Sequence, residues 1–225
     1  AMEFAGDGMK NLTMSDRIAI CNLCVEAGAK TALMEVDDIA LDYLHEHGRE
    51  PKACFTSDAD AKFAAVYDID LSTIAPIVAK PHFVDNVCPA KEAAGVKIDE
   101  AFLGSCNNGR LEDLRVGAEL LKGRKVHPLV RFLVVPASQA VYQQALKEGL
   151  LKIFMEAGAI VMNPNCSVCW GSCQGVIGEG ETLISTGTRN FKGRAGHRDS
   201  FVYLASAATV TASAIKGEIA TADEL

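Results

Sequence analysis

The fold is decided by a pattern that is clearest in DEAFLGSCNNGRLEDLRVGAELLKG, residues 99–123. Its first part, residues 99–106, predicts a strand that ends at a glycine turn, and residues 109–123 predict an amphipathic helix. The alternation continues with a strand at 129–136, a helix at 138–158 and a strand at 159–163. Strands that alternate with helices of this length predict the α/β class, with two lobes and largely parallel sheets.

The amino-terminal part of the chain shows the same alternation. Residues 15–28 predict a helix for which Ser15 is the expected N-cap. Residues 31–36 predict a strand, and residues 37–48 predict a second helix that ends at a glycine. Residues 58–69 have a weaker pattern, which is loosely helical or extended.

A boundary between two lobes is expected within residues 77–89. Residues 77–89 contain two prolines and an irregular pattern, which is typical of a connection. We therefore expect a partial α/β lobe at residues 1–82 and a second α/β lobe, with the cysteine-rich loop, at residues 83–225.

Composition and charge exclude several classes of protein. The 225 residues are 49% hydrophobic and carry a net charge of −7, so neither disorder nor binding to nucleic acid or an anionic membrane is expected. The most apolar stretch, residues 150–162, contains Lys152 and Glu156 and predicts no membrane span. We also expect no secretory signal and a cytoplasmic location, in which the eight cysteines are thiols or metal ligands.

Three cysteines lie close together in NPNCSVCWGSCQG, residues 163–175. Cys166 and Cys169 form a C-x-x-C pair in a loop, where core packing is a weak explanation. Such a pair is compatible with zinc, with an iron–sulfur cluster or with a redox dithiol, and spacing alone leaves these alternatives open. Cys106 follows a predicted strand, as Cys166 does, so both are expected at the carboxyl edge of one sheet.

The remaining cysteines have a simpler interpretation. Cys21 and Cys24 form a second C-x-x-C pair, but it lies on a predicted helix with apolar neighbours. Free cysteine packs well as a small apolar side chain, which also accounts for Cys54 and Cys88.

Four motifs in order resemble those of the aconitase superfamily. They are AICNLCVEAGA (19–29), GSCNNGRLEDL (104–114), NPNCSVCWG (163–171) and GEGETLISTGTRNFKGRAGH (178–197). They are similar to the family patterns I-C-N-M-x-x-E-x-G-A, S-C-T-N-G-R, G-P-x-C-G-P-C-x-G and S-N-R-N-F-x-G-R-x-G. The resemblance extends from about Glu3 to Ile219.

The resemblance implies a [4Fe–4S] cluster held by Cys106, Cys166 and Cys169. One iron would have no cysteine ligand and would act as a Lewis acid on a substrate hydroxyl. Asn22 and Glu26 match family residues beside the cluster, and their i,i+4 spacing would place both on one helical face.

The resemblance also implies a carboxylate-binding role for Arg189 and Arg194. A guanidinium group presents a planar pair of donors to a carboxylate, and a dicarboxylate needs several such groups. His127 and His197 are candidates for proton transfer, although ordinary surface histidines explain them better.

The chain departs from the family patterns at several positions. Asn107 replaces a threonine, Thr188 replaces an asparagine, and Ser167-Val168 replaces a Gly-Pro pair. Cys173 stands where many members have histidine, so we expect it not to be a ligand. These departures affect the expected substrate and subfamily more than the expected cluster.

The branch with the strongest resemblance contains the large subunits of two-subunit hydro-lyases. The implied activity is reversible dehydration of a hydroxy di- or tricarboxylic acid, with isopropylmalate dehydratase of leucine biosynthesis as the first expectation and homoaconitase or dimethylmalate dehydratase as alternatives. The motifs match the second half of such subunits, so we expect the chain to be a fragment or truncated form that is inactive by itself. Activity would also require a small subunit that carries the swivelling domain. The two subunits would form a heterodimer or heterotetramer. Two other classes remain open: a zinc-stabilised binding module, and an electron carrier with Cys173 as the fourth ligand.

Overall fold

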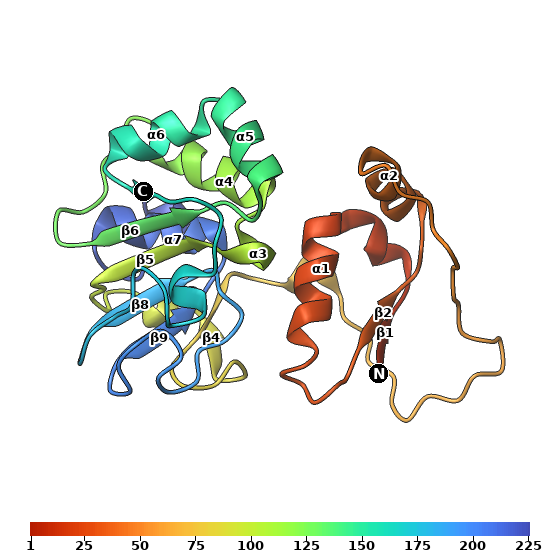
Figure 1. Ribbon diagram of the computed structural model, residues 1–225. Coiled ribbons are helices and arrows are strands. Elements are labelled where there is room, and N and C mark those ends of the chain that lie inside the picture. The colour runs from red at the N-terminus through yellow and green to blue at the C-terminus, as the bar shows by residue number, and fades with distance from the viewer. The chain divides into compact units, whose positions relative to one another are not determined.

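The computed structural model describes residues 1–225, which form two compact units, Ala1–Ile74 and Ala75–Leu225 (Figure 1). The boundary predicted from the sequence falls somewhat later, after residue 82. Both units contain helices and parallel strands, which confirms the predicted α/β class. No helix is long and apolar enough to cross a membrane.

Unit 1 is built around a two-stranded parallel sheet of β1 (Met2–Phe4) and β2 (Ala32–Met34). Its helices are α1 (Met14–Leu23) and α2 (Asp38–Glu46), with short 3-10 turns at Asp7–Asn11 and Leu71–Thr73. The N-cap of α1 is Thr13, not the predicted Ser15, because Thr13 and Asp16 form a reciprocal capping box. Residues 58–69, expected to be loosely helical or extended, form neither a helix nor a strand.

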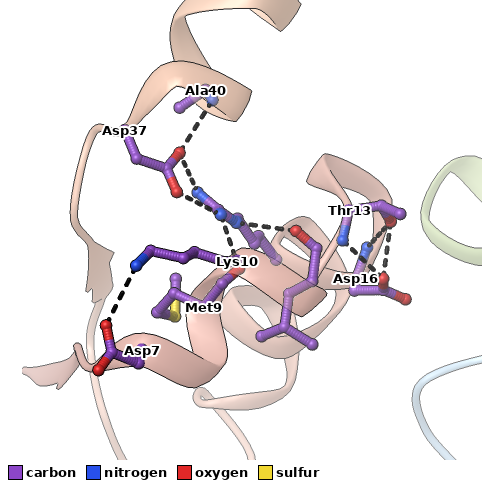
Figure 2. Close-up of polar contacts among 9 residues, drawn as sticks. Asp7, Met9, Lys10, Thr13, Asp16, Asp37 and Ala40 are labelled. Carbon is purple, nitrogen blue, oxygen red and sulfur yellow. Dashed lines mark hydrogen bonds and ion pairs between the residues drawn. The ribbon is translucent and has the colours of Figure 1, made fainter.

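A buried arginine, Arg17, joins several segments of unit 1, and Figure 2 labels its partners Met9 and Asp37. Arg17 donates from Nη1 and Nη2 to the two oxygens of Asp37, each at 2.7 Å, and from Nη2 to the carbonyl of Met9 at 2.8 Å. The hydrogen bond from Arg17 lowers the pKa of Asp37 to about 2. Asp37 also caps α2 by accepting from the amide of Ala40. A polar network therefore occupies the place of an apolar core.

The apolar core of unit 1 is thin. Met9, Arg17 and Cys24 are the only buried residues among its 74. Large apolar side chains such as Phe55, at 79% exposure, and Tyr67, at 83%, lie in the open. The small apolar surface buried in unit 1 stabilises its fold weakly, because apolar burial must offset the conformational entropy lost on folding.

Unit 2 contains a seven-stranded sheet in the order β4-β3-β9-β8-β5-β6-β7. The last five strands in this order are mutually parallel, whereas β3 and β4 are antiparallel. The strands are β3 (Ile77–Ala79), β4 (Val87–Pro89), β5 (Glu100–Gly104), β6 (Arg131–Val135), β7 (Ile160–Val161), β8 (Thr182–Ser185) and β9 (Phe201–Leu204). The helices are α3 (Ser105–Asn108), α4 (Leu111–Leu121), α5 (Gln139–Lys147), α6 (Leu150–Ala157) and α7 (Ala207–Lys216), with 3-10 turns at Ala90–Ala93, Ser167–Cys169 and Ala222–Glu224.

The two faces of this sheet are covered differently (Figure 1). Helices α4, α6 and α7 cover one face, where Leu103 and Val134 pack with Phe154 and Val210. The opposite face is covered by loops and contains Phe102, Leu133, Val168, Ile177 and Ala195 among its buried residues. Alternate residues of each strand face opposite sides, so one strand serves both cores.

Two predicted elements of unit 2 differ in the structure. The helix expected over 138–158 is two helices, because Gly149 adopts a left-handed conformation that ends α5 before α6 begins. The connection expected at 77–89 contains the antiparallel pair β3–β4 at the edge of the sheet.

A carboxyl group is buried on the loop-covered face of the sheet. Glu100, at the start of β5, is completely buried, and its Oε2 accepts from Arg131 Nε at 2.9 Å while its Oε1 has no partner. Arg131 also binds both oxygens of Glu181, at 2.8 and 2.9 Å. Burial raises the pKa of Glu100 to about 7, since it outweighs the hydrogen bond and charge of Arg131.

This raised pKa makes the stability of unit 2 depend on pH. Between the ordinary glutamate value of 4.5 and about 7, folded Glu100 holds a proton that the unfolded chain has released. The stabilisation is therefore complete below pH 4.5 and is lost as pH rises through 7. Wild type should lose about 2 kcal/mol more unfolding free energy than Glu100→Gln between about pH 5.5 and pH 8.

Urea unfolding at several pH values, followed by the fluorescence of Trp170, measures this difference in unit 2. Trp170 is the only tryptophan of the chain. Glu119→Gln, a change on the exposed surface of α4, is the matched control and should follow wild type. Equal pH slopes for wild type and Glu100→Gln would contradict the prediction.

Candidate functional site

The carboxyl edge of the parallel strands in unit 2 gathers most of the predicted site residues. β5 leads directly to Cys106, β7 leads to Cys166 and Cys169, and β8 leads to Arg189. These strands are parallel members of one sheet, so their carboxyl ends lie at the same edge. Ligands of open α/β sheets bind at this edge.

Cys106 lies in α3, a single turn that is fastened to the end of β8. Asn108 Nδ2 donates to the carbonyl of Thr186. The Thr186 hydroxyl accepts from the amide of Gly104 at 2.9 Å and lies within donating distance of the carbonyls of Gly104 and Asn108. Two strand ends are therefore linked next to Cys106.

Cys166 precedes, and Cys169 ends, a 3-10 turn (Ser167–Cys169) that is held by contacts within the loop. The amide of Ser167 donates to Asn165 Oδ1, and its hydroxyl donates to the carbonyl of Gln174 at 2.8 Å. Val168, between the two cysteines, packs into the core of the loop-covered face. The loop is thus held by both polar and apolar contacts.

Backbone strain occurs next to two of the predicted ligands. Ser105 (φ 83°) and Ser167 (φ 42°) are the only residues other than glycine with positive φ, and both are buried. Ser105 precedes Cys106 and Ser167 follows Cys166. Strained conformations persist when the surrounding structure enforces them, and they concentrate at functional sites.

The thiols at this edge are free and accessible. Cys106, Cys166 and Cys173 are exposed, Cys169 is half-buried, and none of the four is in a disulfide. A Cβ placed on Gly187, just after β8, would lie 3.9 Å from the Sγ of Cys169. The side chains do not form a group of three or more metal-binding residues in this structure.

Both predicted carboxylate-binding arginines lie in the segment after β8. Arg189 donates from Nη1 to the hydroxyl of buried Thr188 at 2.6 Å. The Arg194 guanidinium carbon lies 5.7 Å from the ring centroid of Trp170 and 5.3 Å from that of Phe191. Trp170 directly follows Cys169, so the cysteine loop and the arginine segment are in contact.

Asn22 and Glu26 belong to unit 1, and their expected geometry is wrong. Helix α1 ends at Leu23 with Cys24 as its C-cap, so Glu26 lies in the turn that follows and not on the same helical face as Asn22. Cys24 is buried and Cys21 half-buried, and burial raises the pKa of both thiols. Such thiols are less ready to form thiolate ligands.

The two histidines considered for proton transfer lie away from the cysteines of unit 2. His127 precedes β6 and His197 precedes β9, so both are toward the amino ends of the parallel strands. Nδ1 of each accepts a hydrogen bond from a nearby backbone amide, of Leu129 and Asp199 respectively. They are local turn residues at the other edge of the sheet.

Several residues at the site carry no sequence signal of their own. Thr186 and Gly187 connect β8 to both cysteine segments, yet a threonine and a glycine after a strand are common. Trp170 could have been noticed as the only tryptophan, placed beside a predicted ligand.

Comparison with known proteins identifies the family of this chain. The model of the aconitase family (aconitate hydratase) matches residues 1–217. The chain belongs to the aconitase family. As a member of this family, it resembles 3-isopropylmalate dehydratase large subunits along its whole length: it is 47% identical to that of Acetivibrio thermocellus over 225 residues, 49% to that of Aquifex aeolicus over 230 and 48% to that of Thermodesulfovibrio yellowstonii over 225.

The aconitase-family relatives are longer than this chain. The matched region is 54% of the Acetivibrio protein and 53% of each of the other two. The chain therefore spans about half the length of the curated relatives it matches.

Proposed function

We propose that this chain is part of the large subunit of a hydro-lyase that reversibly dehydrates a hydroxy di- or tricarboxylic acid. The observation that carries the proposal is that Cys106, Cys166, Cys169 and Arg189 all follow carboxyl ends of one parallel sheet. Soft thiol donors and a carboxylate-binding cation at one edge suit a metal-assisted reaction on an acid. The names of the relatives make 3-isopropylmalate the first substrate to test.

The proposed cofactor is a [4Fe–4S] cluster held by Cys106, Cys166 and Cys169. The three thiols are free, two are exposed, and each lies in a segment with its own fixed backbone. The bound cluster would supply a Lewis-acidic iron without a cysteine ligand. A further thiol in the same loop, Cys173, is proposed to be outside the ligand set.

The residues of this chain would bind and orient the acid. Arg189 and Arg194 are proposed to bind its carboxylates through paired N–H donors. Asn22 and Glu26 are proposed to act beside the hydroxyl group, with Glu26 placed by the turn after α1 rather than by the helix. The base and acid that move protons would come from outside residues 1–225.

The proposed assembly is larger than this chain. A small subunit is proposed as partner because the relatives are named large subunits. The thin core of unit 1 suits a partial lobe that the rest of a full-length subunit would complete. A cytoplasmic location and a role in leucine biosynthesis are part of the same proposal.

Analysis of bound metal tests this function. After anaerobic reconstitution, the chain should hold about four iron and about four acid-labile sulfide ions, as one [4Fe–4S] cluster requires. Addition of isopropylmalate to the chain assembled with a small subunit and the missing half should change the EPR spectrum of the reduced cluster. Stoichiometric zinc without sulfide would contradict the proposal and support a zinc-stabilised binding module.

A further inference from the structure

The guanidinium group of Arg194 contacts two aromatic rings. Its Cζ lies 5.7 Å from the ring centroid of Trp170, in the cysteine loop, and 5.3 Å from that of Phe191, in the arginine segment. We propose that these two aromatic residues are positioning residues, which hold Arg194 ready for a substrate carboxylate. The inference deepens the proposed function, on which it rests for the identity of the ligand class, an organic di- or tricarboxylate.

The electrostatic state of Arg194 supports this assignment. None of the ion pairs of the chain involves Arg194, and its Nε is buried without a hydrogen-bond partner. An arginine on a protein surface usually finds a carboxylate or carbonyl for its donors. Here the aromatic rings contact the cation, and rings cannot satisfy the N–H donors in the manner of a carboxylate.

The solvent exposure of the two aromatic rings also supports a positioning role. Trp170 is 60% exposed and Phe191 50% exposed, although both are large apolar side chains. Their contact with the guanidinium group gives a reason for their position, since a cation is attracted to the face of an aromatic ring. Phe191 and Arg194 are also joined by a turn, in which the amide of Arg194 donates to the carbonyl of Phe191 at 2.9 Å.

The backbone brings the two segments into direct contact. A Cβ on Gly171 would overlap the carbonyl oxygen of Arg194, so the chain at Gly171 passes against the chain at Arg194. The amide of Ile177 donates to the carbonyl of Ala195 at 3.0 Å, which continues the contact. Trp170 therefore links Cys169, its neighbour in sequence, to the arginine that would bind the acid.

The experiment measures binding of malate, a simple hydroxy dicarboxylate, to the iron-free chain by isothermal titration calorimetry. Trp170→Leu and Phe191→Leu should each weaken binding about two- to fivefold, the range of a cation–π contact at a partly exposed site. Trp170→Phe keeps a ring and should retain most of the affinity. Arg194→Met should weaken binding about tenfold or more, because it removes charge-assisted hydrogen bonds.

Two controls separate positioning from folding. Tyr67→Leu removes an exposed aromatic side chain of unit 1, and Arg124→Lys changes an exposed arginine; neither should alter malate affinity. A second measurement uses Trp170, whose fluorescence should change in Arg194→Met and in wild type on addition of malate.

The outcomes are distinguishable from those of the metal analysis. Equal malate affinities in wild type and Trp170→Leu, or no malate binding to wild type, would overturn the inference. Failure to bind iron and sulfide would overturn the proposed function and leave these malate measurements, made without iron, unaffected.

Discussion

Replacement of Cys106, Cys166 or Cys169 by serine is expected to abolish loading of an iron–sulfur cluster. Each thiol is proposed as the only protein ligand of one iron, and a serine hydroxyl is a poor substitute for a soft thiolate. Iron and acid-labile sulfide per chain, measured after reconstitution, should fall from about four of each to near zero in all three variants.

Cys173→Ser is the matched control, because Cys173 is an exposed, free thiol in the same loop as Cys166 and Cys169. This variant should load iron and sulfide like wild type, and Cys54→Ser, in unit 1, should do the same. Loss of the cluster in Cys173→Ser would contradict the three-ligand site and would favour an electron carrier with four cysteine ligands.

The periodicity of the sequence predicted the part of unit 2 that positions the cysteines. The strands observed as β5, β6 and β7 and the helix α4 lie inside their predicted ranges. These segments are short apolar runs between glycine turns or strongly amphipathic stretches, for which local pattern is a reliable guide. The convergence of Cys106 and Cys166 at one edge then follows from parallel pairing alone.

Other features depend on contacts that no local pattern encodes. Strands β8 and β9 were not predicted as strands, and they become part of the sheet through pairing with β5 and with each other. The helix break at Gly149 and the end of α1 at Leu23 each occur at one residue within a stretch whose pattern is otherwise helical, so the pattern does not predict them. The second of these displaces Glu26 from the expected helical face.

The identity of the third proposed cysteine ligand also cannot be predicted from the spacing of the cysteines. Residues 163–175 contain three cysteines, and spacing alone gives no reason to choose Cys106 over Cys173 as the third ligand. That choice came from the family motifs. The contact of Trp170 with Arg194 is likewise a product of tertiary structure, since it joins two loops that are remote in sequence.

The second large effect is expected from Gly171→Ala, which should separate the cysteine loop from the arginine segment. Gly171 has a φ of 74°, and an added Cβ would collide with the backbone carbonyl of Arg194, which cannot rotate away as a side chain would. The left-handed conformation costs alanine about 1 kcal/mol. The collision should add about 2 kcal/mol, within the usual range for overpacking.

Gly180→Ala carries only the first of these costs, so its difference from Gly171→Ala isolates the second. Gly180 has the same φ of 74°, and no atom lies within 4 Å of the position of its added Cβ. Urea unfolding followed by far-UV circular dichroism should show Gly171→Ala to be less stable than Gly180→Ala by about 2 kcal/mol. Iodide should also quench Trp170 more strongly in Gly171→Ala alone, because the indole would leave Arg194. Equal stability and equal quenching in the two variants would mean that the contact between the loops does not hold Trp170 against the arginine.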